Sequence, residues 1–101
     1  MNKPAFFIFD ARIHHPEAMQ PYQQRVAATW KAFGGKLLVL GAAETVEGAS
    51  PNGTLAMLQF ASIDDARAWY ASVDYQEILP YRHAAAQTNG WLVEGIAQDI
   101  E

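Results

Sequence analysis

The side chains best suited to chemistry in this sequence are an arginine next to a histidine and two carboxylates set in apolar stretches. Arg82 can clamp a carboxylate, and the adjacent His83 can act as a general acid or base near neutral pH. Asp10 and Glu94 come late in two otherwise apolar runs, and a carboxylate held in an apolar cleft has a raised pKa and can act as a base. The alternative for Arg82 and His83 is a cationic helix end on the surface, and for the carboxylates a strand end that reaches water.

Two tyrosines extend this set of candidates, because a buried tyrosine hydroxyl needs a hydrogen-bond partner and can bind a ligand. Tyr22 and Tyr70 fall on stretches with helical periodicity, in which Trp30 and Trp69 are better explained as core. The sequence therefore predicts a candidate pocket for a small organic ligand formed by Asp10, Tyr22, Tyr70, Arg82 and His83. No catalytic residue is assigned among them.

Metal, nucleotide and hydrolase chemistry has no support in the sequence. The histidines are His14, His15 and His83, and adjacent side chains on an extended stretch point in opposite directions, so the first two cannot easily chelate one ion. There is no cysteine, which excludes disulfides and thiolate ligands. Because phosphate-binding glycine motifs, nucleophile-elbow serines and zinc-binding histidine motifs are also missing, we predict no metal and no cofactor.

Length and charge limit the partners. The 101 residues suffice for one domain, half of them are hydrophobic, and the net charge is −4. The absence of a basic run argues against nucleic acid as a partner. The apolar run Ala5–Phe9 is too short for a signal peptide or a membrane span, so we expect a cytoplasmic protein with no membrane partner.

Strands and helices that alternate along the chain must position these side chains. The stretch Leu55–Phe60 is apolar enough for a buried strand, and Ser62 with Asp65 is close to a capping box that begins a helix. A further short helix is predicted to begin at Asp74. The other predicted strands are Ala5–Ile13, Lys36–Ala42 and Trp91–Ile96. The two apolar stripes on predicted helices are Met19-Tyr22-Val26-Trp30-Phe33 and Ala66-Trp69-Tyr70-Val73.

Prolines and glycines mark expected interruptions. Pro21 requires either that the main helix begins near Gln20 or that a short turn precedes it. Pro80 is expected to bend or break the short helix, and Asn89-Gly90 predicts a turn. Residues 97–101 are expected to form a frayed tail.

The order strand–helix–strand, repeated once, has a simple packing solution. An α+β, ferredoxin-like domain over residues 1–101, with a four-stranded antiparallel sheet and both main helices on one face, buries both helical stripes. Both alternating sets of strand side chains are apolar, so the other face of the sheet would be left uncovered. We therefore expect a homodimer in which two sheets pack together and bury about 1,600 Å², a standard interface.

Several short motifs resemble a known family. The motifs are Gly34-Gly35, Glu47-Gly48, QFAS-x-x-x-A-x-x-WY at Gln59–Tyr70, S-x-x-YQ at Ser72–Gln76 and VEG at Val93–Gly95, and they are similar to the family of domain of unknown function 1330. The resemblance runs over nearly the whole chain and implies a dimeric α/β barrel, similar in architecture to antibiotic-biosynthesis monooxygenases and muconolactone isomerases. It implies no assigned reaction, and it puts Arg82 where the family often has arginine. His15, Leu40 and Gln59 depart from the family's usual pattern.

Two hypotheses of function follow. The first is a protein that binds a small molecule in a pocket. Its more specific form is a cofactor-independent enzyme of oxygenase or isomerase type that acts on small organic substrates, which is an analogy at the level of the fold. The second is a non-catalytic dimeric module for ligand binding or interaction. A polar, converging cavity would favour the first hypothesis, whereas a space filled by Trp30, Phe33 and Trp69 would favour the second.

Overall fold

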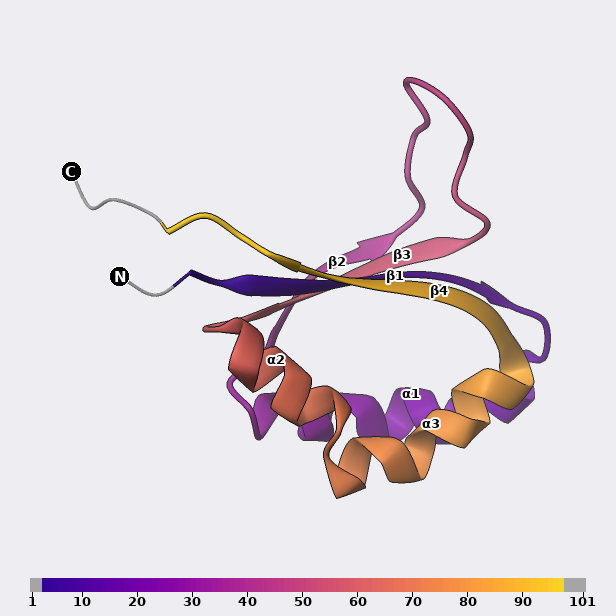
Figure 1. Ribbon diagram of the computed structural model, residues 1–101. Coiled ribbons are helices and arrows are strands. Elements are labelled where there is room, and N and C mark those ends of the chain that lie inside the picture. Colours follow the sequence, from indigo (N-terminus) through magenta and orange to yellow (C-terminus); the bar gives the residue numbers. More distant parts are fainter. Residues whose placement is uncertain (1–2, 98–101) are drawn as a thin grey trace.

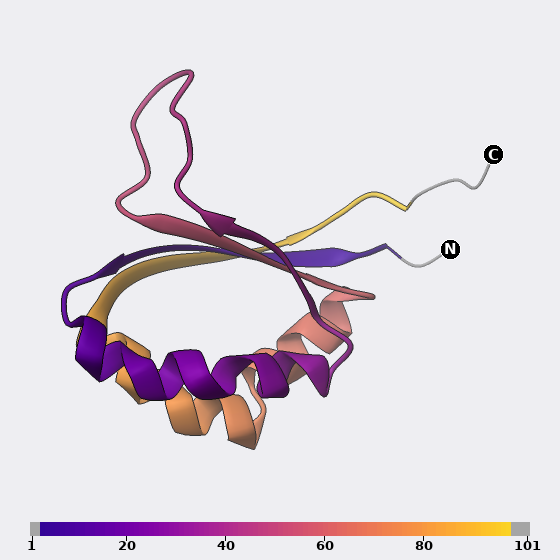
Figure 2. The same cartoon turned by 180° about the vertical axis from the view of Figure 1, so that it is seen from behind.

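The computed structural model describes residues 3–97, so that most of the predicted tail, residues 98–101, lies outside the described range. The elements are β1 (Ala5–Ile13), α1 (Pro16–Lys31), β2 (Lys36–Gly41), β3 (Thr54–Phe60), α2 (Ile63–Tyr70), α3 (Val73–Ala85) and β4 (Ala86–Glu94). Within this range four strands form one sheet in the order β2-β3-β1-β4, and every neighbouring pair is antiparallel. The helices of the described range all cover one face of the sheet, as the two opposite views show (Figure 1, Figure 2). The predicted ferredoxin-like α+β fold is confirmed.

Aromatic rings fill much of the core between the sheet and the helices. Trp69 of α2 is fully buried, and its ring centroid lies 5.3 Å from that of Phe7, 5.5 Å from that of Phe60 and 4.1 Å from that of Tyr75. Its indole N–H donates a hydrogen bond to Thr29 Oγ1 at 3.0 Å, so the polar group of this buried ring has a partner. The interpretation of Trp69 as core is confirmed.

Two serines and a glycine set the helix ends. Ser62 Oγ accepts the N–H of Asp65 at 3.1 Å at the start of α2, as predicted, and Ser72 Oγ accepts the N–H of Tyr75 at 3.3 Å at the start of α3. After α1 the chain turns at Gly34, whose φ of 74° lies in the left-handed region that favours glycine. These local signals determine where each helix leaves the sheet and returns to it.

The prolines interrupt the helices less than the sequence suggests. Pro21 lies inside a continuous α1, so neither predicted alternative is right, and Pro80 lies inside α3, which continues past it. Each proline lacks the N–H that would bond to the carbonyl four residues earlier, on Glu17 and Gln76. Both of these residues are exposed, so water can bond to the freed carbonyls and the helices stay intact.

The fourth strand begins before the predicted Trp91. β4 follows α3 directly and pairs with all nine residues of β1, so the turn predicted at Asn89-Gly90 is wrong. Gly90 lies opposite Phe9 in mid-strand, and a Cβ at this position would stand 2.9 Å from Cε1 of the Phe9 ring. The glycine makes room for an aromatic side chain of the neighbouring strand and does not reverse the chain.

The sheet face away from the helices carries a row of four apolar side chains. Ile8 lies between Met57 and Trp91 in the pairing of the strands, and Val39 lies opposite Met57. We call Val39, Met57, Ile8 and Trp91 the open-face row. Trp91 is 52% exposed and Val39 is 40% exposed, and no helix of the described range covers the row (Figure 2).

None of the helices found among residues 3–97 combines the length and the apolar character that crossing a lipid bilayer requires.

Candidate functional site

Arg82 lies in the last turn of α3, close to the corner between β1 and α1. The carbonyl of Ala85 accepts the backbone N–H groups of His14 at 2.8 Å and His15 at 3.1 Å, which ties the end of α3 to this corner. Arg82 is only 6% exposed, and among residues 3–97 no carboxylate lies within salt-bridge distance of it. Burial of a charge without a counter-ion costs on the order of several kcal/mol, so the position of this arginine requires an explanation.

Neutral groups surround the charge of Arg82. Its Nη2 donates a hydrogen bond to Tyr75 Oη at 3.3 Å, and the hydroxyl oxygens of Tyr75 and Tyr22 are 2.9 Å apart. The guanidinium carbon lies 5.2 Å from the centre of the Phe9 ring and 5.6 Å from the centre of the Tyr22 ring, which are cation–π distances. Aromatic faces and hydroxyl oxygens therefore stabilise this cation in place of a carboxylate.

Two groups of this cluster, Tyr75 and Arg82, keep their protons near neutral pH. Burial raises the pKa of the Tyr75 phenol far above its ordinary value, and Tyr22 raises it further, so Tyr75 stays neutral. Burial alone would lower the pKa of Arg82, but its interactions with Tyr75 and Tyr22 raise that pKa by more. The cluster thus combines the permanent positive charge of Arg82 with the neutral hydroxyl of Tyr75.

Two buried polar atoms near this cluster have no hydrogen-bond partner within residues 3–97. They are Arg82 Nε and Thr88 Oγ1. Thr88 lies opposite Ala11 on β4, hence on the sheet face that the helices cover. Because nearly all buried polar groups in proteins are hydrogen-bonded, each unpartnered atom is a candidate contact for a ligand.

Arg82 and Thr88 border two cavities between the sheet and the helices. The smaller cavity, of about 180 Å³, is lined by Phe7, Phe9, Tyr70, Arg82, His83, Thr88 and Gly90. The larger cavity, of about 550 Å³, has a mainly apolar lining from α1 and the sheet that includes Met19, Tyr22, Val26, Trp30, Leu37, Leu40, Ala56 and Leu58. Because Phe9, Arg82 and Thr88 line both cavities, the guanidinium stands at their junction.

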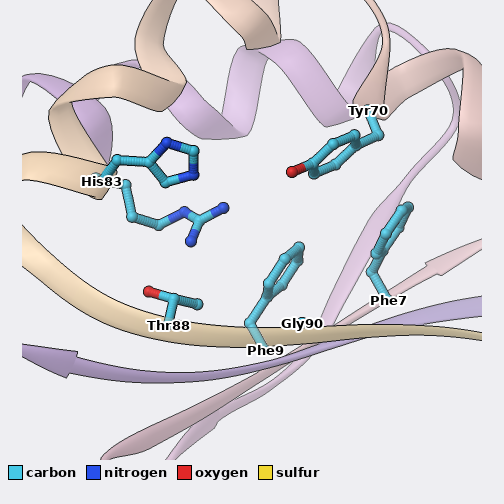
Figure 3. Close-up of a pocket in the computed structure, with 7 residues that line it drawn as sticks. Phe7, Phe9, Tyr70, His83, Thr88 and Gly90 are labelled. Atoms are coloured by element: carbon cyan, nitrogen blue, oxygen red, sulfur yellow. The ribbon is translucent and has the colours of Figure 1, made fainter.

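The smaller cavity has a polar side and an aromatic side. Figure 3 shows the Tyr70 hydroxyl directed across the space toward the His83 ring, while Phe9 and Thr88 rise from the sheet opposite. His83 is exposed, so it stands at the mouth of this cavity. The histidine can therefore meet both solvent and the cavity interior.

Four of the five predicted site residues border these cavities. Tyr70, Arg82 and His83 line the smaller one, and Tyr22 and Arg82 line the larger one. Whether any of them acts on a ligand stays a prediction. Glu94 is exposed at the end of β4, in agreement with the alternative of a strand end that reaches water.

Asp10 requires a correction, because it lines neither cavity. Strand alternation directs it away from the helices, since its neighbour Phe9 faces them. The two carboxylate oxygens accept the backbone N–H groups of Asn52 and Gly53, both at 2.8 Å. Asp10 therefore anchors the end of the β2–β3 loop to β1.

Sequence reasoning missed Tyr75 and Thr88. Tyr75 precedes Arg82 by seven residues, which puts both on one side of a helix, but this signal requires that α3 continue past Pro80. Thr88 gives no signal of its own, because the turn expected at Asn89-Gly90 put it outside any strand.

Metal binding gains no support from the described part of the chain, where no group of three or more His, Asp or Glu side chains could hold an ion. The absence of a metal and of a cofactor stays a prediction.

The fold and its cavities define a class of small α+β proteins with an open space between a four-stranded sheet and its helices. Within that class, the chain belongs to the family described as Domain of unknown function (DUF1330), which it matches over residues 4–96. The resemblance noted in the sequence motifs is thereby confirmed. No curated protein matches this chain in sequence.

Solved structures with low sequence identity share the fold. The RPA0582 protein of unknown function from Rhodopseudomonas palustris has a TM-score of 0.77 at 14% identity, covering 97% of this chain and 86% of that chain. SnoaB, a cofactor-independent oxygenase from Streptomyces nogalater, has a TM-score of 0.66 at 13% identity, covering 97% and 96% of the two chains. HapK from Hahella chejuensis has a TM-score of 0.63 at 10% identity, covering 96% and 97%.

Proposed function

We propose that this protein binds a small organic molecule in the larger cavity. The observation that carries the proposal is a space of about 550 Å³ that stays open beside large aromatic residues. Trp69 belongs to the core and does not line this cavity, and Trp30 lines it without closing it. Ligand pockets typically measure about 300–1,000 Å³ and combine apolar walls with a few polar groups, here Tyr22, Arg82 and Thr88.

We further infer that the bound molecule is the substrate of a cofactor-independent enzyme of oxygenase or isomerase type. The fold shared with SnoaB, which is described as a cofactor-independent oxygenase, supports this class of reaction by analogy. The permanent charge of Arg82 beside the neutral hydroxyl of Tyr75 adds a physical argument. In an apolar cavity such groups stabilise negative charge that develops on a substrate oxygen.

A cavity-filling substitution tests the binding proposal. Ala27 and Ala28 are neighbours on α1, but Ala27 lines the larger cavity and Ala28 is exposed. A panel of mono- and bicyclic aromatic compounds is titrated into the wild type, Ala27→Phe and Ala28→Phe, with isothermal titration calorimetry as the readout. Binding by the wild type should be lost in Ala27→Phe and kept in Ala28→Phe. If no compound binds, or if Ala27→Phe binds as the wild type does, the proposal is wrong.

A second function, self-association through the sheet, is favoured by the open-face row. We propose that a second copy covers this row, because several neighbouring apolar side chains rarely stay in water on a soluble protein. Met57 belongs to the row, whereas Leu58 is buried on the helix side, so Met57→Glu is the variant that should separate the copies. Gln24→Glu, on an exposed residue of α1 on the other side of the sheet, is the control. Analytical ultracentrifugation should give twice 11.2 kDa for the wild type and the control. A wild-type monomer at micromolar concentration would contradict the proposal.

A further inference from the structure

We propose that the ligand of the larger cavity is an organic carboxylate. Its acid group would lie between Arg82 and Thr88, and its apolar body would extend into the cavity toward α1. This inference rests on the proposed function and adds the chemical class of the ligand.

The first argument is the unbalanced charge of Arg82. The side chain is 6% exposed and has no carboxylate partner among residues 3–97. The titratable side chains that face it or share its cavities are Tyr22, Tyr70, Tyr75 and His83. None of these side chains is a carboxylate. An anion is therefore the partner that this buried cation lacks.

The second argument is the pair of unpartnered polar atoms. Arg82 Nε and Thr88 Oγ1 are buried and make no hydrogen bond within the described residues. The two oxygens of one carboxylate can accept from both, and arginine binds carboxylates through paired N–H donors. A water molecule at this place would serve both atoms but would leave the charge uncompensated. A carboxylate satisfies the hydrogen bonds and the charge together.

The third argument is the position of these groups at the junction of the cavities. Phe9, Arg82 and Thr88 line both, so an acid group held here has apolar space on one side of it. The larger cavity continues along Val26 and Trp30 of α1 and has room for a flat body of one or two rings. The smaller cavity, of about 180 Å³, leads from the acid group to His83 at its mouth.

Ligand pairs that differ in charge and hardly in shape test the inference. 2-Naphthoate and 2-naphthamide are titrated separately into the wild type and into Arg82→Met, and calorimetry gives both affinities. The wild type should bind the acid at least about tenfold more tightly than the amide, because charge-assisted hydrogen bonds are the stronger ones. In Arg82→Met the ratio should fall to about one with the amide affinity kept, and Arg82→Lys should retain part of the preference.

Thr88 offers a second, independent set of variants. Thr88→Val keeps the shape of the side chain but removes the hydroxyl, so it should weaken acid binding about threefold or more, and Thr88→Ser should restore it. Equal binding of acid and amide by the wild type, or an acid preference that survives in Arg82→Met, overturns this inference and leaves the proposed function in place. If neither ligand nor any compound of the aromatic panel binds to the wild type, the proposed function is wrong and this inference fails with it.

Discussion

Replacing Arg82 by methionine should leave the ligand-free protein as stable as the wild type or more stable. Burial of the guanidinium costs on the order of several kcal/mol, since no carboxylate compensates it among residues 3–97. The hydrogen bond to Tyr75 returns about 1.5–3 kcal/mol, and the contacts with the rings of Phe9 and Tyr22 return about 0.5–2 kcal/mol each. Methionine fills a similar volume without the charge, and the hydroxyls of Tyr22 and Tyr75 keep each other as partners. We therefore expect the free energy of unfolding to rise by about 0–2 kcal/mol.

Urea titration and thermal unfolding of the ligand-free protein measure this change. For a domain of this size, each kcal/mol corresponds to about 4–8 °C in Tm. Arg25→Met is the matched control, because Arg25 is exposed and pairs with Glu77 at 2.8 Å, and such a surface pair contributes about 0–1 kcal/mol. A loss of more than about 2 kcal/mol in Arg82→Met would refute the reasoning, since the arginine would then stabilise the fold itself and need no ligand to explain it.

Three further predictions concern Tyr75, Asp10 and Thr29. Burial raises the pKa of Tyr75 above its ordinary value of 10.0, so the unfolded chain loses this proton at lower pH than the folded protein does. Above about pH 10 this group should therefore lower the free energy of unfolding by about 1.4 kcal/mol per pH unit. Tyr75→Phe should flatten that fall in urea titrations between about pH 9 and pH 11, and equal slopes for the two proteins would contradict the assignment. Asp10→Ala should cost about 1.5–3 kcal/mol and speed hydrogen exchange at the amides of Asn52 and Gly53 without changing ligand affinity. Weaker ligand binding in this variant would show that Asp10 contributes to the ligand site. Thr29→Val should cost about 1–3 kcal/mol by leaving the indole N–H of Trp69 buried without a partner, and a neutral result in thermal unfolding would rule out this role for the bond.

Local signals predicted the elements of the fold well where they involve few residues. The side chain of Ser62 caps the start of α2, and the pair Gly34-Gly35 follows the end of α1. Both signals could be predicted because capping and left-handed turns depend on neighbours in sequence. The prolines were harder to interpret, because a helix tolerates Pro21 and Pro80 when the carbonyls they free can reach water. That exposure depends on tertiary packing, which a single sequence does not display.

The candidate site could be predicted only in part, because the register of the strands determines which sheet face each side chain occupies. Both alternating sets of β1 begin apolar, so the face that Asp10 occupies follows only from the pairing of β1 with its neighbours. The glycine at position 90 carries a turn signal, but its neighbour in space is the ring of Phe9. Arg82 could be proposed from its chemistry and from the family resemblance, whereas the unpartnered atom of Thr88 became visible only with the cavities.

The direct passage of α3 into β4 divides the chain into parts that can vary separately. Arg82 and Thr88 come from one continuous stretch with no loop between its helix and its strand, so insertions elsewhere do not alter their spacing. The apolar walls come mainly from β1, α1, β2 and β3, which precede that stretch in sequence, and most of the long β2–β3 loop is exposed. Substitutions in the elements before α2 would therefore change the size of the ligand that the cavity accepts. The unchanged α3 and β4 would keep the preference for a negatively charged ligand. A redesign for new ligands would retain α3 and β4 and diversify α1.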